Sequence, residues 1–509
     1  MLIASILASG MVFIDGTALS VAMPALQADM AASGANLLWV TNGFSLPLAA
    51  LLLFGGALGD CFGRRKIFIA GIAAFTAASL ACGLAPSVPW LIAGRVAQGV
   101  GGALMVPGAL AMISSFFPPA ERGKAIGAWS AFSVLATTVG PVLGGVLAGA
   151  GLWRGVFFIN LPLSAVALGI LLVKIPADKK PARPVPVDWW GAITVTLGLG
   201  GLTHGLIQWS KPGGADAWVV TALVVGVASL IAFVVIQRTV RHPLLPFDVF
   251  ESRTLKGASA LSLLFYMGFH GTLFFLPLNL IQVQGYSPAL AGLTQLPLMA
   301  LLVGLSQWAG RLVDRRGPRL PLTLGPALAG AGFLLFAVPG VTAGPKEFWF
   351  TYLPGFLLVG AGLGVTAAPL STTVMDSVPA QRLGLASGIN SSLTRVAGVF
   401  AIAILGPIVL AWFGQALAQR TADLHLPAAV ATQLQHEAAK LADAQVPAGL
   451  TAEETLAVKA AIKASFVDAF RIAVALAAGL SWLGALIAAR TVTALPVPPG
   501  TRPAGTGAH

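Results

Sequence analysis

The sequence predicts an all-α protein that crosses a membrane many times. Of its 509 residues, 57% are apolar and only 9% are charged, whereas soluble proteins carry about 25% charged residues. The apolar residues form long runs, and an α-helix needs about 20 mostly apolar residues to cross a bilayer. A short loop pattern also occurs once in each half of the chain. Together these observations predict a polytopic membrane protein made of two related helical bundles.

Fourteen apolar segments are candidates for membrane-spanning helices, because each is bounded by charged or Pro- and Gly-rich breaks. No Lys or Arg precedes Arg64, and Asp15 interrupts the first run. The first segment is therefore expected to be a retained helix rather than a cleaved signal peptide. The predicted segments are 2–26, 37–59, 67–85, 89–114, 123–149, 153–175, 188–208, 216–237, 257–282, 289–312, 320–341, 347–375, 381–412 and 465–490.

The distribution of basic residues predicts the orientation of these segments. Loops after even-numbered segments hold most of the Lys and Arg residues, beginning with Arg64 and Arg65. Short loops after odd-numbered segments hold only Arg154, Lys211 and Lys346. Because basic loops stay in the cytoplasm, an even number of helices with both termini cytoplasmic is expected.

The loop between the second and third segments has a partner between the tenth and eleventh. In the first copy Gly56 is followed by Asp60, Gly63 and Arg64. The second copy repeats the spacing with Gly310, Asp314 and Gly317, and places Arg315 directly after the aspartate. Glycine permits a tight turn between helices, and arginine resists crossing the bilayer. The repeat predicts that the first six and the last six segments correspond.

The repeat divides the chain into four parts. We expect an N-terminal six-helix bundle in 1–175, and a two-helix insert with charged, proline-rich cytoplasmic linkers in 176–256. A C-terminal six-helix bundle is expected in 257–490, followed by a cytoplasmic tail in 491–509. Within the second bundle, 413–464 is a long outer segment between the last two helices, either a solvated connector or a small helical hairpin.

Two ionisable residues within the predicted spans are the strongest functional candidates, since such residues are costly in a bilayer. Asp15 lies near the middle of the first segment, where burial disfavours the charged carboxylate unless a cation offsets it. Arg95 lies on the fourth segment, and Gln98 shares its helical face. Asp15 is a candidate proton carrier, with a permanently paired structural aspartate as the alternative. Arg95 is expected to point inward, with a position at the membrane surface as the alternative.

The fifth segment contains Gly140, Pro141, Gly144 and Gly145. Proline bends a helix, and glycines allow a second helix to pack closely. Other polar or aromatic residues in the spans are candidates to line a substrate pocket, although bonds between helices are the commoner role for amides, and a buried structural histidine is the alternative for His270. Arg395 is also a candidate to balance an acid in the other bundle. The pocket candidates are Asn42, Gln98, Phe269, His270, Asn279, Gln295, Asn390 and Arg395.

Several other function classes are disfavoured. The net charge of +12 is spread over short loops and is not clustered as a nucleic-acid-binding face requires. Cys61 and Cys82 have no metal-binding spacing. No HExxH, GxSxG or nucleotide-binding GxxxxGK[ST] motif occurs, so no metal, cofactor, enzymatic activity or ATP dependence is expected.

The chain resembles the major facilitator superfamily, and more closely its fourteen-helix branch of drug–proton antiporters. Five motifs carry the resemblance, and they occur in the expected order on the expected segments. They are the first-helix motif at 15–24, the loop signature at 56–65, the fourth-helix motif at 91–103, the antiporter motif at 140–145 and the segment 153–162.

The resemblance implies a major facilitator fold with fourteen helices arranged as six, two and six, and transport by alternating access. It assigns proton coupling to Asp15 and Arg95, and the antiporter motif to the glycines and proline of the fifth segment. It assigns a cytoplasmic gate to the two loop copies, at Gly56, Asp60, Gly63, Arg64, Asp314 and Arg315.

The resemblance also implies a substrate class and a setting. The substrate would be a lipophilic, preferably cationic, drug or toxic compound, exported across a bacterial cytoplasmic membrane by the proton gradient. Two departures qualify this: Cys61 replaces a basic residue of the loop signature, and the thirteenth segment lacks the acids that help some relatives to recognise dications. Dedicated export of one endogenous metabolite or lipid is the alternative function.

Overall fold

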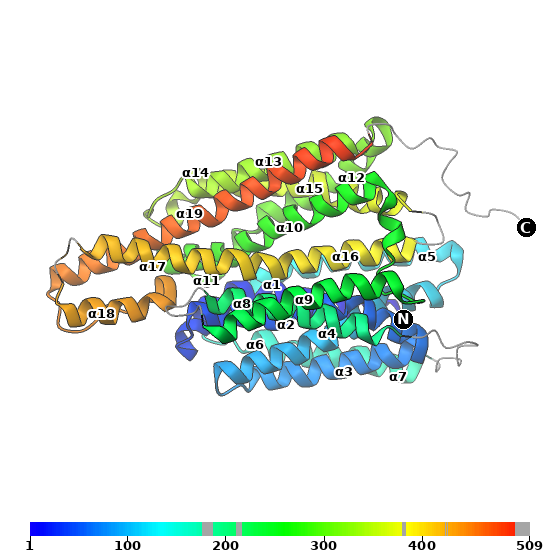
Figure 1. The fold of residues 1–509 in the computed structure, drawn as a ribbon, viewed down its shortest axis with the longest axis horizontal. Coiled ribbons are helices and arrows are strands. Elements are labelled where there is room, and N and C mark those ends of the chain that lie inside the picture. The colour runs from blue at the N-terminus through cyan, green and yellow to red at the C-terminus, as the bar shows by residue number, and fades with distance from the viewer. Residues whose placement is uncertain (176–186, 210–215, 379–382, 423, 425, 494–509) are drawn as a thin grey trace, which may run out of the picture.

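The computed structural model describes residues 1–493 except 176–186, 210–215, 379–382, 423 and 425. The described residues form helices and connecting turns without a β-strand, and fourteen helical segments are long and apolar enough to cross a membrane. Most helices run along the long axis of the molecule (Figure 1). In a bilayer, a helix satisfies all its own backbone hydrogen bonds, which is why such apolar segments adopt this conformation. The predicted all-α fold is confirmed.

The first bundle packs helices through close glycine contacts. In α2, Gly55 lies so close to α4 that a Cβ atom would overlap the carbonyl oxygen of Ala103. In α3, Gly71 makes a similarly close approach to Met105. The bundle comprises α1 (Leu2–Met30), α2 (Gly34–Phe62), α3 (Arg64–Gly83), α4 (Val88–Phe116), α5 (Pro119–Gly149), and α6 (Gly155–Phe158) with α7 (Asn160–Lys174).

Two helices follow as a hairpin, α8 (Trp189–Trp209) and α9 (Ala217–Thr239), and lie in the middle of the view in Figure 1. At its start, Asp188 accepts hydrogen bonds from the backbone of Gly191 at 2.8 Å and from Gln237 of α9 at 2.5 Å. The α8 helix packs against α2 of the first bundle and against α16 (Leu383–Phe400) and η5 (Ala401–Leu405) of the second. The hairpin therefore touches both bundles.

The second bundle contains the remaining helices and two π-helical turns, η2 and η5, in otherwise α-helical spans. Its elements are η1 (Phe247–Glu251), α10 (Arg253–Leu278), η2 (Asn279–Val283), α11 (Pro288–Leu293), α12 (Leu296–Arg316), α13 (Arg319–Ala337), η3 (Pro345–Glu347), α14 (Phe348–Thr351), α15 (Leu353–Asp376), α16, η5, α17 (Gly406–Ala422), α18 (Ala428–Glu437), η6 (Ala438–Asp443) and α19 (Ala452–Thr491).

The last two spans extend further than predicted. The thirteenth continues from 385 to Ala422, and α19 begins at Ala452. Thr451 and Glu454 form a reciprocal capping box that fixes this start. Together with α18 and η6, these extensions form a helical projection beyond the rest of the bundle (Figure 1). Hydropathy located only the apolar part of each helix, because an Ala-rich polar helix can continue into water.

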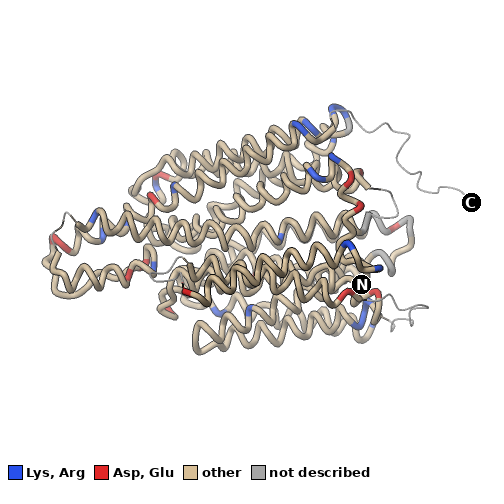
Figure 2. The backbone as a smooth tube through the Cα atoms, viewed as in Figure 1, with Lys and Arg blue, Asp and Glu red and all other residues tan. Residues whose placement is uncertain are grey.

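The repeated loop has the same backbone form in both copies. Gly63 between α2 and α3 has φ of +103°, and Gly317 between α12 and α13 has φ of +75°. Glycine adopts such values without the steric cost of a Cβ atom. Both loops lie with the N-terminus at one end of the molecule, where Lys and Arg gather (Figure 2). We call this the basic end, defined by residues 64–66, 238–256 and 311–319.

Candidate functional site

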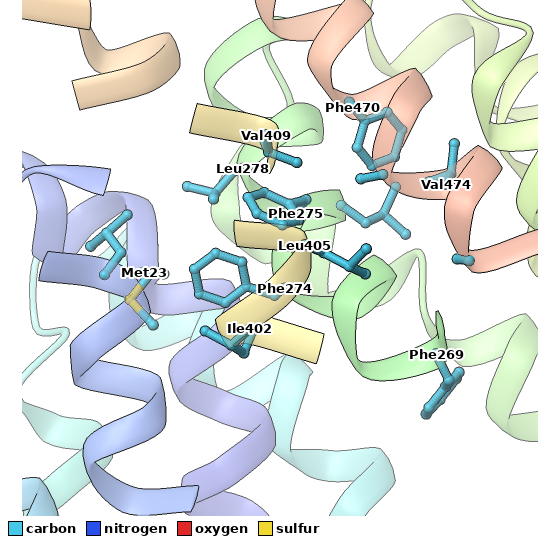
Figure 3. Close-up of a cluster of buried hydrophobic side chains, with 14 of the residues drawn as sticks. Met23, Phe269, Phe274, Phe275, Leu278, Ile402, Leu405, Val409, Phe470 and Val474 are labelled. Atoms are coloured by element: carbon cyan, nitrogen blue, oxygen red, sulfur yellow. The ribbon is translucent and has the colours of Figure 1, made fainter. Parts of the chain in front are cut away.

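A large cavity lies between the two bundles and opens at the basic end. Its volume is about 1230 Å³, and both bundles contribute to its lining. The lining includes Asp60 and Arg64, whose side chains are about half exposed at the mouth. At its inner end, Met23 of α1 faces Phe274 and Ile402 of the second bundle (Figure 3). The cavity is thus open on one side and ends in an apolar cluster on the other.

Contacts between the bundles close the end opposite to the basic end. Gln282 of η2 donates a hydrogen bond to Gln27 of α1 at 3.0 Å, and Gln27 donates to the backbone oxygen of Lys440 at 2.6 Å. Gly145 of α5 lies so close to Pro288 of α11 that a Cβ atom would overlap the proline carbonyl oxygen. Together these contacts, two of which involve a backbone oxygen, hold the two bundles together at this end.

Asp15 and Arg95 form a buried ion pair inside the first bundle. Arg95 also donates to Gln98 at 2.9 Å, and Gln98 donates to Asp15 at 3.2 Å and to Ser79 at 2.7 Å. Asn160 of α7 donates to Ser79 at 3.2 Å. Four helices, α1, α3, α4 and α7, therefore supply one polar network. Such burial is tolerated because the two charges offset each other and hydrogen bonds satisfy the carboxylate.

The ion pair touches the cavity on one side only. Arg95 is part of the cavity lining, whereas Asp15 is fully buried behind it. The guanidinium carbon of Arg95 lies 4.4 Å from the ring centre of Phe44, and its Nε donates to the backbone oxygen of Val40 at 3.2 Å. A cation held over an aromatic face is stabilised by the ring quadrupole. Arg95 thus lines the cavity and at the same time pairs with Asp15.

The glycines of α5 bring it against α1. A Cβ atom at Gly140 would overlap the Thr17 hydroxyl, and one at Gly144 would overlap the Ala18 carbonyl oxygen. The α5 helix also makes a close contact with α11. The carbonyl oxygen of Pro141 lies so close to Gly292 of α11 that a Cβ atom on Gly292 would overlap it. The α5 helix thus joins α1 within its own bundle to α11 of the other bundle.

The first loop copy lies at the cavity mouth. Arg64 donates to Asp60 at 2.9 Å, and Gly56 also lines the cavity. Among the described contacts, Asp60 bonds within its own bundle and not to the opposite one, which accords with an open mouth. In the second copy Arg315 is exposed, and the side chain of Asp314 falls outside the described part of the structure.

Five of the eight predicted pocket residues line the cavity: Phe269, His270, Gln295, Asn390 and Arg395. The other three do not. Gln98 belongs to the Asp15 network, and Asn279 donates to the Tyr352 hydroxyl at 2.9 Å, away from the lining. Asn42 is fully buried in α2 with neither side-chain amide atom hydrogen-bonded.

Several lining residues are not among the predicted pocket residues. Tyr266 lines the cavity, and its ring centre lies 6.5 Å from that of Phe269 and 6.1 Å from that of His270. The helical spacing of these three residues on α10 is the signal that could have found this aromatic face. Trp129 of α5 and the segment 241–244 after α9 also line the cavity. In the described part of the chain, no cluster of three or more His, Cys, Asp or Glu could hold a metal ion.

Comparisons of the sequence identify its relatives. The family profile of the Major Facilitator Superfamily matches residues 5–402. The tetracenomycin C resistance and export protein of Streptomyces glaucescens is 32% identical over 496 residues, which cover 96% of this chain and 90% of the relative. The puromycin resistance protein pur8 of Streptomyces alboniger is 36% identical over 403 residues, 78% of this chain and 79% of the relative. The multidrug resistance protein Stp of Mycobacterium tuberculosis is 32% identical over 85% of this chain and 79% of the relative.

Solved structures share the fold. A bacterial homologue of the human lysosomal transporter Spinster, in an inward-facing and occupied conformation, superposes with a TM-score of 0.63 at 20% identity, covering 96% of each chain. A D-xylose–proton symporter superposes with a TM-score of 0.58 at 15% identity, covering 96% of this chain and 97% of the symporter. At these identities the likeness concerns the fold alone.

Proposed function

Because this chain belongs to the Major Facilitator Superfamily, whose members are membrane transporters and not enzymes, we propose that it exports lipophilic drugs or toxic compounds in exchange for protons. The observation that carries the proposal is the buried Asp15–Arg95 pair at the wall of a cavity of about 1230 Å³. Relatives named for drug resistance and export support the direction and the broad substrate class.

The cavity suits a lipophilic compound of drug size. Ligand sites are concave, mostly apolar and supplied with a few polar groups. Here Phe44, Tyr266 and Phe274 provide aromatic surface, and Gln295 and Thr394 provide hydrogen-bonding groups. The cavity has room for structurally different compounds, which supports a broad substrate range.

Proton coupling is proposed to act through the two members of the ion pair. With Asp15 ionised, Arg95 is held by it; protonation of Asp15 removes that attraction and frees the guanidinium at the cavity wall. A proton on Asp15 and a substrate in the cavity are thereby linked, because each changes the surroundings of the Arg95 side chain. The energy comes from the proton gradient and no ATP is required.

Alternating access is proposed to move the cavity opening from one end to the other. The described conformation is open at the basic end, so the Asp60–Arg64 loop would close the mouth in the opposite state by contacting the other bundle. Meanwhile the contacts of Gln27 and Gly145 would separate. The positive-inside rule supports placing the basic end, both termini and the cavity mouth in the cytoplasm of a bacterial cell.

The test uses purified protein in liposomes with a trapped pH-sensitive dye. Addition of a transported compound should move protons in the wild type and not in Asp15→Asn. Proton movement of equal rate in the variant would refute the role of Asp15. No movement with any compound of a broad panel would refute multidrug export, and would favour dedicated export of one metabolite or lipid.

A further inference from the structure

The charges that line the cavity are not balanced. Asp60 is paired with Arg64 at the mouth, and Arg95 is paired with Asp15. Asp188 accepts hydrogen bonds from α8 and α9. Every carboxylate described in the lining is thus already engaged.

Arg395 differs from these groups. It lines the cavity from α16. Its guanidinium forms no hydrogen bond or ion pair with another described residue. An arginine in a membrane-spanning segment is costly and normally has a partner. In the described conformation, the space in front of Arg395 belongs to the substrate cavity.

The surroundings of Arg395 are aromatic and polar. His270 of α10 packs against Gly398, one turn further along α16 than Arg395. The ring centre of His270 lies 5.7 Å from that of Phe269 and 6.1 Å from that of Tyr266. Asn390, five residues earlier on α16, also lines the cavity and has a buried side-chain oxygen without a hydrogen-bond partner.

We infer that Arg395 binds an acidic group of the substrate, and that the preferred substrates are aromatic compounds with a carboxylate or an acidic phenol. This inference rests on the proposed export function. A guanidinium forms two parallel hydrogen bonds to a carboxylate, while the rings on α10 offer a face for an aromatic body. A cation would find no free carboxylate in the described lining and would be repelled by Arg395. The cavity therefore does not favour the cationic class that the sequence suggested.

The test measures equilibrium binding in nanodiscs of phosphatidylcholine, which separates recognition from transport. The probes share one ring system: pyrenebutyrate, the neutral pyrenebutanol and a pyrenebutyl trimethylammonium salt. The wild type should bind pyrenebutyrate about tenfold or more tightly than pyrenebutanol, as expected for a charge-assisted bond. Equal affinity for the three probes, or preference for the cation, would overturn the inference without any variant.

Substitutions then assign the effect to one residue. Arg395→Gln should abolish the preference for pyrenebutyrate over pyrenebutanol, whereas Arg395→Lys should retain part of that preference. Arg319→Gln is the matched control, because it removes the same charge from an exposed position outside the cavity. A preference that survives in Arg395→Gln, or that Arg319→Gln also removes, would overturn the assignment.

Two further outcomes are distinguishable. A phospholipid phosphate has the same anionic chemistry, so short-chain phosphatidylglycerol is added as a competitor. If phosphatidylglycerol displaces pyrenebutyrate at a concentration equal to or below that of pyrenebutyrate, Arg395 would be reassigned to lipid binding and the inference would be overturned. Proton-driven export of the ammonium probe alone, with Arg395→Gln unaffected, would overturn the acidic substrate class and leave the export function standing. Failure of the wild type to transport any probe, despite binding the acid, would count against export instead.

Discussion

Arg95 of α4 lines the cavity and donates a hydrogen bond to Asp15 of α1, while Asp15 itself has no exposed surface. One residue thus faces two environments, the cavity and the interior of the first bundle. Substitutions of Asp15 and of Arg95 should therefore have different effects on transport and on stability.

Neutralising Asp15 should uncouple transport from the proton gradient. Asp15→Asn can keep a hydrogen bond from Gln98 but cannot bind and release a proton. We expect proton-driven transport in liposomes to fall to background, while binding of a fluorescent substrate persists. Asp29→Asn is the control on the same helix, since Asp29 pairs with Arg154 at 2.5 Å outside the network and should be dispensable for coupling. Full transport by Asp15→Asn would contradict the assignment.

Removing one member of the ion pair should cost more stability than removing both charges. Arg95→Gln leaves Asp15 buried without a cation, and an uncompensated buried charge costs about 3–5 kcal/mol. The double variant Asp15→Asn, Arg95→Gln has no charge left to bury and should recover much of the loss. Thermal unfolding of Asp15→Asn, Arg95→Gln and the double variant in one detergent measures this coupling. If the stability losses of the two single variants add up in the double variant, the pair does not act as a unit. Transport by the double variant should remain absent even though its stability is recovered.

Enlarging Gly144 should block transport, because a side chain there overlaps the Ala18 carbonyl oxygen and forces α5 away from α1. Gly144→Leu should insert into the membrane but transport at background level, and Gly144→Ala should also be strongly impaired, because its Cβ atom already meets the Ala18 oxygen. Gly149, near the end of the same helix, has open space around it, since a Cβ atom there would have no neighbour within 4 Å. Gly149→Leu should therefore transport normally. Wild-type rates in Gly144→Leu would show that this contact is not needed in the cycle.

Joining the bundles at the closed end should arrest the cycle. Gln27 and Gln282 meet through their side chains at 3.0 Å, and both can be replaced by cysteine after substitution of Cys61 and Cys82. A cleavable bifunctional thiol reagent should stop transport by Gln27→Cys, Gln282→Cys, and a reductant should restore it. The single-cysteine variants treated in the same way report the effect of modification alone. Continued transport after complete cross-linking would mean that this end does not open.

Two acids in the projection should respond oppositely to neutralisation. Burial disfavours ionised Glu437, but hydrogen bonds from Lys440 and from the backbone of Gln445 outweigh it and hold the pKa of Glu437 below its usual range. Its stabilising effect is therefore present above the ordinary pKa and is lost as the pH falls through the lowered value. Burial raises the pKa of Asp443, with partial compensation by Lys440, so its charged form destabilises the fold at neutral pH.

Accordingly, Glu437→Gln should loosen residues 428–443 at pH 7 by roughly 0.5–1 kcal/mol, and Asp443→Asn should tighten them. Hydrogen exchange of this segment measures both effects. The difference between Glu437→Gln and the wild type should shrink in acid. Changes of the same sign in both variants, or a pH-independent difference, would contradict the proposed balance.

The sequence predicted the helices and the buried charges more reliably than the contacts. Fourteen spans were recognisable because the bilayer requires apolar helices, and Asp15 and Arg95 because ionisable residues are rare there. The family resemblance is also confirmed by the match over residues 5–402. The roles of these charges stay predictions until transport is measured.

Contacts between distant segments could not be predicted. Nothing in the local sequence indicates that Asn279 bonds to Tyr352, 73 positions away, or that Gln98 faces Asp15 rather than the cavity. Helix rotation and packing decide these contacts, and one sequence does not specify them. The beginning of α19 could have been predicted from the sequence, since Thr451 and Glu454 have capping-box spacing.

The hairpin of α8 and α9 makes the two seams between the bundles unequal. By packing on α2 and α16, it covers the seam between the bundles on that side. On the other side, α5 borders α12 without cover from this hairpin. Under the proposed export function, the bilayer around the two seams is therefore not equivalent, because the hairpin separates one seam from the lipid and does not cover the α5–α12 seam.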